Sequence, residues 1–504
     1  MKTERMNILL IMTDQQRYDS LGCDGSSFVF TPTIDRIATD GILFDRTYCT
    51  NPICTPSRVS IFTGMYPGGH GVWHNGMYAN RPDAFISDLL RRQEYSTWYI
   101  GKAHFNPWTA PAGESPESFM QGWERYMADF KLPYYGFENC ELSIGHTSFG
   151  HYGHYGLWLK EKLGGSPNFA FRRRGSSVFG CEAIDWDIPV ELHNNAWVAE
   201  RSIHALHRAK AVNKPFFMTV SFQDPHHPHC LPTALAKKIR LENIPPPRYT
   251  VGELEDKPPH FMLAHEGKAQ YPDKTKYRKP DEYTHAFRDV VNEDAILAKA
   301  YYYAMVEFID YSLKSLMDEL DALGMTDNTL VIFTSDHGEM LGDHGLWKKG
   351  PFHYEQLVHI PLIIKPPCFK RASAKYNGIV SLADIAPTIL ETAGIAIPEY
   401  MDGRSLCPIW NGNEIISRDC VFIEYVDNPK GLRLKTVVTE RYKLTIYHGQ
   451  PYGELYDLET DPLEMVNRFY DSDATDVRLS LTAMLFDEME KTEMKIRGKR
   501  VSSS

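Results

Sequence analysis

The segment Asn7-Ile8-Leu9-Leu10-Ile11-Met12-Thr13-Asp14-Gln15 joins a short apolar run directly to two polar side chains. A continuous apolar run of this length is typical of a strand that is buried on both faces of a parallel sheet. It is too short for the apolar core of a signal peptide, and Asp14 ends it. The segment therefore predicts a central strand with Asp14 and Gln15 at its carboxyl end.

Similar apolar runs recur along the chain at Ser96–Ile100, Phe216–Phe222, Leu330–Thr334 and Pro361–Lys365. Helical patterns lie between them. The clearest is Ile296–Leu323, which Gly324 follows, and another is Leu382–Ala393, which Gly394 closes. Alternating strands and helices predict an α/β fold with a large, mainly parallel sheet flanked by helices.

The pattern changes near residue 411, where short strands follow one another. They are expected at Val421–Tyr425, Leu434–Thr439, Tyr442–Tyr447 and Glu454–Leu458, before a final helix at Val477–Lys491. We therefore expect a catalytic α/β domain over residues 1–410 and a smaller C-terminal α+β domain, built on an antiparallel sheet, over residues 411–504. Stretches near 107–213 and 231–294 are rich in Pro, Gly, His and aromatic residues, and we interpret them as insertions that form a pocket rim.

Polar side chains follow four of the predicted strands. In open α/β sheets the functional site lies beyond the carboxyl ends of the strands, so these side chains are expected to meet. Ordinary polar loops are the alternative, but loops rarely gather His, Lys and Asp so consistently. The residues are Asp14 and Gln15, Lys102 and His104, His226, and Asp336 and His337.

A further motif is Cys54-Thr55-Pro56-Ser57-Arg58, which Thr63-Gly64 follows. Pro56 suits the first turn of a helix, where its missing N–H needs no partner. Such a helix would place Cys54 at its N-terminus, where backbone N–H groups and the helix dipole favour an anion. Arg58 lies one turn further and can reach back to Cys54 or to nearby carboxylates. The alternative is a buried structural cysteine.

This motif resembles the signature of the formylglycine-dependent sulfatases, a family of the alkaline phosphatase superfamily. The resemblance implies that a formylglycine-generating maturase, as a transient partner, converts Cys54 to formylglycine. The hydrated aldehyde carries two hydroxyls on one carbon. One attacks sulfur and displaces the alcohol, and loss of a proton from the other expels sulfate and restores the aldehyde.

The resemblance extends to the strand ends and implies one divalent metal ion held by Asp14, Gln15, Asp336 and His337. The usual pairs of the family are Asp-Asp and Asp-Asn. The Asp-Gln and Asp-His pairs of this chain resemble those of choline sulfatases and phosphonate monoester hydrolases. Oxygen ligands favour Ca²⁺, and one imidazole shifts the preference towards Mn²⁺. A turn in which Asp336 is only a capping residue is the alternative.

The elements that would bind the sulfate group are also similar to those of the family. Gly101-Lys102-Ala103-His104 resembles its Gly-Lys-x-His element, in which the lysine contacts sulfate and the histidine helps to deprotonate the second hydroxyl. His226 and Lys349 resemble residues that hold sulfate and protonate the leaving oxygen. The adjacent Lys348 leaves the register open by one residue, and we prefer Lys349. His74 and Asn75 are expected to contact substrate.

The composition limits the classes of partner. The net charge of −11 and the lack of a long Lys/Arg run argue against a nucleic-acid binder. Nine scattered cysteines without a C-x-x-C pair fit reduced thiols. No segment reaches the ~18 apolar residues of a membrane span. We expect a soluble, cytoplasmic enzyme with no membrane partner, and a homo-oligomer stays open.

Three functions follow as hypotheses. The first is hydrolysis of a carbohydrate, aryl or choline sulfate ester, since the aromatic residues of the insertions suit sugars, aryl groups or quaternary ammonium. The second is a phosphonate monoester or phosphodiester hydrolase on the same scaffold, which Gln15 and His337 motivate. The third is a non-catalytic binding protein in which Cys54 stays a thiol.

Overall fold

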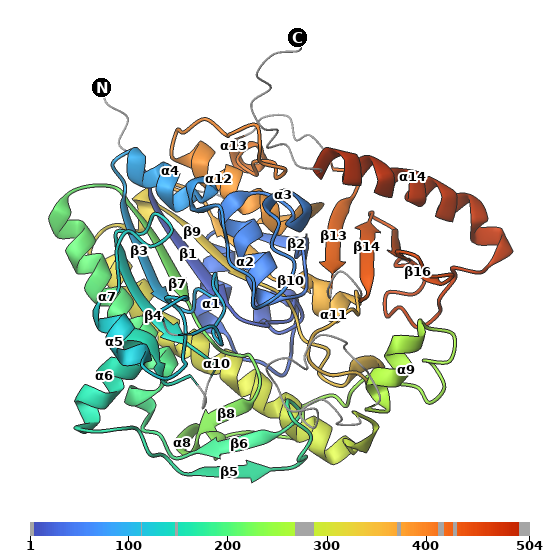
Figure 1. Cartoon of the computed structure of the whole chain (residues 1–504), viewed down its shortest axis with the longest axis horizontal. Coiled ribbons are helices and arrows are strands. Elements are labelled where there is room, and N and C mark those ends of the chain that lie inside the picture. The colour runs from blue at the N-terminus through green and yellow to red at the C-terminus, as the bar shows by residue number, and fades with distance from the viewer. Residues whose placement is uncertain are drawn as a thin grey trace.

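The computed structural model describes residues 5–111, 113–146, 150–267, 287–369, 374–411, 418–426 and 431–492. Figure 1 shows a large sheet with helices on both sides, and beside it a smaller sheet flanked by the last helix. The expected α/β fold with a C-terminal antiparallel unit is confirmed.

The central strand is β1 (Asn7–Thr13), which is buried along its whole length. It pairs in parallel with β7 (Phe216–Ser221) and with β9 (Thr329–Ser335). Successive side chains of a strand point to opposite faces of the sheet. Accordingly Ile8, Leu10 and Met12 join one apolar core, whereas Leu9 and Ile11 join the other.

The described residues form a nine-stranded large sheet with the order β10-β2-β11-β9-β1-β7-β3-β4, and β12 pairs with β2. The strand expected at Pro361–Lys365 runs antiparallel to both of its neighbours, β9 and β2. The sheet is nevertheless mainly parallel, as expected, because β1 pairs in parallel with β7 and β9, and β3 pairs in parallel with β7 and β4. The remaining strands are β2 (Ile42–Tyr48), β3 (Ser96–Gly101), β4 (Asn139–Ile144), β10 (His359–Ile360), β11 (Leu362–Lys365) and β12 (Ala374–Ser381).

Helices cover both faces of this sheet (Figure 1). Apolar residues of α2 (Cys54–Thr63), α4 (Ile86–Arg92) and α12 (Ile385–Thr392) lie in the core that contains Ile8. Those of α1 (Pro32–Thr39), α7 (Asn194–Val212) and α10 (Asn292–Ala322) lie in the core that contains Leu9. The helix expected from Ile296 thus starts earlier, at Asn292.

The two proposed insertions have structure of their own. Three short strands, β5 (Phe171–Arg174), β6 (Ala183–Trp186) and β8 (His229–Pro232), form a separate small sheet. Short helices α5 (Trp123–Ala128), α6 (Gly153–Leu163), α8 (Thr233–Ala236) and α9 (Pro259–His265) accompany it. However, β4 pairs with β3 in the large sheet, and α7 packs on that sheet. Residues 107–213 are therefore not an insertion alone.

The C-terminal unit is a four-stranded antiparallel sheet, β13 (Val421–Val426), β14 (Arg433–Val438), β15 (Tyr442–Tyr447) and β16 (Gly453–Asp457), with α14 (Thr475–Thr492) against it. Lys443 of β15 donates to Glu355 Oε1 at 2.8 Å and pairs with Glu464 Oε1 at 2.6 Å. Because Glu355 follows Lys349 closely, this buried bridge ties the C-terminal sheet to a segment of the site. The division of the chain at residue 410 stays a prediction.

None of the nine cysteines, all of which lie in the described ranges, forms a disulfide with another. Within the described ranges, every helix is too short or too polar to cross a membrane.

Candidate active site

The site is built around the first turn of α2, at the carboxyl ends of β1 and β9. Cys54 is the first residue of this helix and is fully buried. Asn75 Oδ1 accepts a hydrogen bond from the Thr55 N–H at 3.0 Å, which satisfies one of the open donors of the helix. Gly64 ends the helix with a φ of +66°, a conformation that glycine adopts without strain.

Cations and metal-competent groups surround the Cys54 thiol. Its Sγ lies 2.7 Å from Lys349 Nζ and 3.8 Å from Lys102 Nζ. It also lies 3.3 Å from His337 Nε2 and 3.8 Å from Asp14 Oδ1. Burial and Asp14 raise the pKa of the thiol, but the two lysines outweigh them and hold this pKa below its ordinary value. The first turn of α2 therefore faces a centre that stabilises negative charge.

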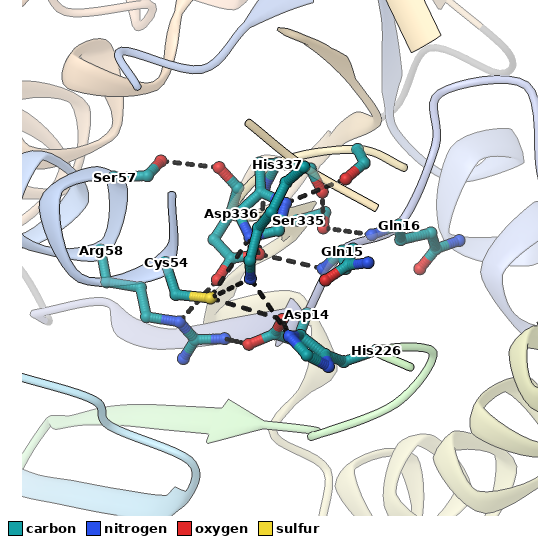
Figure 2. Close-up of polar contacts among 12 residues, drawn as sticks. Asp14, Gln15, Gln16, Cys54, Ser57, Arg58, His226, Ser335, Asp336 and His337 are labelled. Atoms are coloured by element: carbon teal, nitrogen blue, oxygen red, sulfur yellow. Dashed lines mark hydrogen bonds and ion pairs between the residues drawn. The ribbon is translucent and has the colours of Figure 1, made fainter. Parts of the chain in front are cut away.

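Arg58 holds the two carboxylates of the site together, as Figure 2 shows. Its Nε donates to Asp336 Oδ2 at 2.7 Å, and its Nη2 donates to Asp14 Oδ2 at 2.9 Å. Its Nη1 donates to the Lys102 carbonyl and the Ser221 hydroxyl, at 2.7 and 3.0 Å. All three ionised side chains are fully buried. Burial alone would raise the pKa of Asp14, but Lys102 and Arg58 hold that pKa well below its usual range.

Asp14, Asp336 and His337 lie with Cys54 in a cluster that could hold a divalent cation. Ligand atoms of Asp14, Asp336, His337 and Cys54 all lie within 4.8 Å of one another. His337 Nδ1 lies 2.9 Å from the Gly338 carbonyl, so Nδ1 carries the proton and Nε2 is left to bind an ion. Gln15 Oε1 is buried and has no hydrogen-bond partner among the described residues. Two carboxylates, an amide oxygen and an imidazole nitrogen are all groups that bind divalent cations.

The structure separates the two adjacent lysines. Lys349 Nζ contacts Cys54 Sγ and also lies 3.1 Å from His226 Nε2 and 3.1 Å from His337 Nε2. Lys348 Nζ lies instead over the ring of Phe179, at 4.5 Å from its centroid. The geometry therefore favours the preferred register, in which Lys349 faces Cys54.

Lys102 and His226 meet through a residue that the sequence did not single out. Lys102 Nζ pairs with Asp14 and lies 2.6 Å from His146 Nε2. The His146 ring stacks on that of His226, with centroids 3.5 Å apart and planes at 4°. His226 Nε2 in turn lies 4.0 Å from Asp14 Oδ1. His146 thus joins two of the predicted catalytic residues.

Three predicted residues lie around this group rather than in contact with Cys54. The His104 ring stacks on Trp108 with centroids 3.8 Å apart, and in the described part of the chain no hydrogen bond joins it to Cys54. Asn75 contacts the start of α2. The ring of His74 packs edge-on against Tyr425, with centroids 6.2 Å apart. The roles of His104, His74 and Asn75 stay predictions.

Two residues of the site, His146 and Glu339, were missed, and only His146 had a signal in the sequence. His146 follows β4, in which Cys140, Leu142 and Ile144 are buried at alternating positions. Recognition of that alternation would have placed His146 at a strand end beside the others. Glu339 comes three residues after Asp336, and it accepts a hydrogen bond from Gln15 Nε2.

A buried thiol at a helix N-terminus, two carboxylates paired with an arginine and several cations at one sheet edge are what a hydrolase of anionic esters needs. A family model described as sulfatase matches residues 6–395, and one described as N-sulphoglucosamine sulphohydrolase, C-terminal, matches residues 342–491. The chain belongs to the sulfatase family.

Its relatives cover nearly the whole chain. It is 29% identical over 493 residues to an arylsulfatase of Clostridium perfringens, covering 97% of this chain and 95% of the relative. It is 27% identical over 507 residues to an N-acetylglucosamine-6-O-sulfatase of Bacteroides thetaiotaomicron, covering 93% and 83%. A phosphonate monoester hydrolase of Agrobacterium radiobacter superposes with a TM-score of 0.80 at 27% identity, covering 97% and 96%.

Proposed function

We propose that this enzyme hydrolyses sulfate monoesters with a formylglycine hydrate at position 54 as the nucleophile. The single observation that carries the proposal is the position of Cys54. It is the first residue of α2, and its Sγ lies within 3.8 Å of two ammonium groups, a carboxylate and an imidazole. An inert structural thiol would be expected in apolar surroundings, where the thiolate is not stabilised.

The residues around position 54 divide the work of the reaction. Lys102 and Lys349 supply positive charge where the sulfate oxygens gain negative charge. The Lys349 ammonium and the His226 imidazole, whose nitrogens lie 3.1 Å apart, hold the proton that the leaving alcohol oxygen takes up. Arg58 fixes Asp14 and Asp336 at their separation through two charge-assisted hydrogen bonds.

A divalent ion, Ca²⁺ or Mn²⁺, fits the set of Asp14, Gln15, Asp336 and His337. When bound, it would polarise a sulfate oxygen and lower the pKa of the attacking hydroxyl. Gln15 Oε1 is buried and has no hydrogen-bond partner among the described residues, so a bound cation would satisfy it.

The substrate, partners and compartment are part of the same proposal. The relatives act on aryl and N-acetylglucosamine sulfates by their names, so we propose a carbohydrate or aryl sulfate ester, with choline sulfate as a third choice. A transient contact with a formylglycine-generating maturase is implied, and a homo-oligomer stays open. The lack of a disulfide among the nine cysteines, all within the described residues, supports a cytoplasmic location.

Peptide mass tests the nucleophile directly. Trypsin releases residues 47–58, which contain both Cys49 and Cys54. Conversion of Cys54 lowers the mass of this peptide by about 18 Da and leaves Cys49 as the one thiol that iodoacetamide alkylates. Two alkylated thiols in an active preparation would refute the proposal, and in an inactive one they would favour the unconverted binding protein. Cys54→Ala should abolish turnover of an aryl sulfate.

A second candidate function has one specific observation in its favour. The phosphonate monoester hydrolase has the same fold over nearly the whole chain. The resemblance of Gln15 and His337 to the metal ligands of such enzymes points the same way. A hydrated aldehyde can attack phosphorus as well as sulfur. Comparing kcat/KM for an aryl sulfate and an aryl phosphonate decides between them, and a large preference for the phosphonate would replace the sulfatase proposal.

A further inference from the structure

The side-chain amide of Gln15 has two possible orientations, which exchange the places of its oxygen and its NH₂ group. Of its two ends, only the oxygen can bind a cation, because the NH₂ group is a pure donor. Because Gln15 is fully buried, bulk water cannot hydrogen-bond to an end of the amide that lacks a protein partner. Whether Gln15 serves as a ligand therefore depends on what holds its NH₂ group.

Two acceptors face that NH₂ group. Gln15 Nε2 donates to Glu339 Oε2 in a short hydrogen bond, and it lies 3.0 Å from His227 Nδ1. Glu339 accepts one amide hydrogen, and His227 Nδ1 accepts the other in the tautomer that carries its proton on Nε2. Oε1 keeps no partner among the described residues. The NH₂ group is therefore fixed by hydrogen bonds, whereas the oxygen remains available to a ligand.

The Gln15 backbone is held as well. Its N–H donates to Asp336 Oδ1 at 3.0 Å, and its carbonyl accepts from the Tyr302 hydroxyl at 2.9 Å. Its φ is +67°, in the left-handed region that is strained for a residue other than glycine. This conformation persists because the neighbouring contacts fix it.

Glu339 is itself held by the main chain. Its Oε1 accepts from the Leu341 N–H at 3.0 Å and from the Lys348 N–H. Its backbone carbonyl accepts from Arg17 Nη1 at 3.1 Å. With the acceptor fixed in this way, a flipped Gln15 would turn its oxygen against the carboxylate of Glu339, and the two acceptors would repel each other.

We propose that Glu339 and His227 are positioning residues that orient the Gln15 amide so that its oxygen faces the divalent cation. This inference rests on the metal site of the proposed function. Outer groups of this kind typically change metal affinity by 10–100-fold when they are removed. The pair therefore makes an otherwise ambiguous amide a defined ligand.

The test is calorimetric titration of Ca²⁺ alone and of Mn²⁺ alone into full-length protein stripped with EDTA. Glu339→Gln is expected to weaken binding by about 10–100-fold. In a Gln15→Ala background the same substitution should change affinity by less than about 3-fold, because the amide it orients is gone. Glu454→Gln is the matched control, since Glu454 is also buried but accepts from Tyr447 and Tyr456 in the C-terminal sheet. Its metal affinity should match that of wild type.

Each outcome is informative. Equal losses for Glu339→Gln with and without Gln15 would overturn the positioning role while leaving the metal site intact. Failure of wild-type protein to bind either ion would overturn the metal site and the inference with it. If Glu339→Gln does not fold, as judged by circular dichroism, His227→Leu replaces it. That variant removes the second acceptor and should also weaken binding, and unchanged affinity there would count against the proposal.

Discussion

Replacement of Arg58 by methionine should destabilise the fold strongly. The change keeps the apolar stem but removes four hydrogen bonds, two of them to buried carboxylates at 2.7 and 2.9 Å. Asp14 keeps its pair with Lys102, whereas Asp336 loses its guanidinium partner. Removal of one member of a buried ion pair costs about 3–5 kcal/mol, because the remaining charge is left in a poorly solvated place. We expect the free energy of unfolding to fall by that amount.

Guanidinium unfolding, followed by tryptophan fluorescence with EDTA present, measures this loss. The control is Arg201→Met, because Arg201 also holds a carboxylate with two hydrogen bonds, to Glu141 at 2.7 and 2.8 Å. That pair is partly exposed, at 26% and 28%, so its removal should cost about 1 kcal/mol or less. Equal losses for the two variants would refute the argument that burial sets the cost.

Further predictions concern the site, the pH dependence of stability and one glycine. Lys349→Ala should lower kcat/KM for an aryl sulfate by about 10²–10³-fold, whereas Lys348→Ala should change it far less. If steady-state kinetics show the larger loss for Lys348→Ala, Lys348 is the lysine that contacts sulfate. Lowering the pH from 7 to 5 should reduce the unfolding free energy, because burial holds the pKa of His353 at about 3, below the usual 6.5, and the unfolded chain takes up the proton first. An unchanged denaturant midpoint over that range would contradict this. Gly101→Ala should give little folded protein, because a Cβ there would lie 1.8 Å from the Ser221 carbonyl oxygen and φ is +105°. A melting curve like that of wild type would show that the backbone at this edge of the sheet can move to accommodate the Cβ.

Much of the fold was predictable because the central strands are short, continuous apolar runs. The run Ile8–Met12 and the run Leu330–Thr334 lie within β1 and β9 almost residue for residue. Strands with mixed composition were missed. β2 contains Asp45 and Arg46, which are only partly buried, and β4 alternates polar and apolar residues. Such strands form because neighbouring strands supply hydrogen bonds and a core, which the local pattern does not report.

The site was predictable where residues follow predicted strands or belong to a recognised motif. Asp14, Asp336 and Arg58 meet as the strand-end argument requires. His146 and Glu339 were missed for different reasons. The strand before His146 was not recognised, and the contact between Glu339 and Gln15 joins residues 324 positions apart in the chain. A contact over that separation depends on the whole topology and leaves no trace in local spacing.

The bridge from Lys443 to Glu355 and Glu464 also limits how this enzyme could be rebuilt. A chimera that joined residues 1–410 to the C-terminal sheet of a relative would keep the nucleophile and its carboxylates. Unless that sheet carried a cation at the place of Lys443, Glu355 would stay buried without its ammonium partner. The segment between Lys349 and Glu355 would then lose its ion pair with the C-terminal sheet, so we expect a working chimera to need a matching cation in the new sheet.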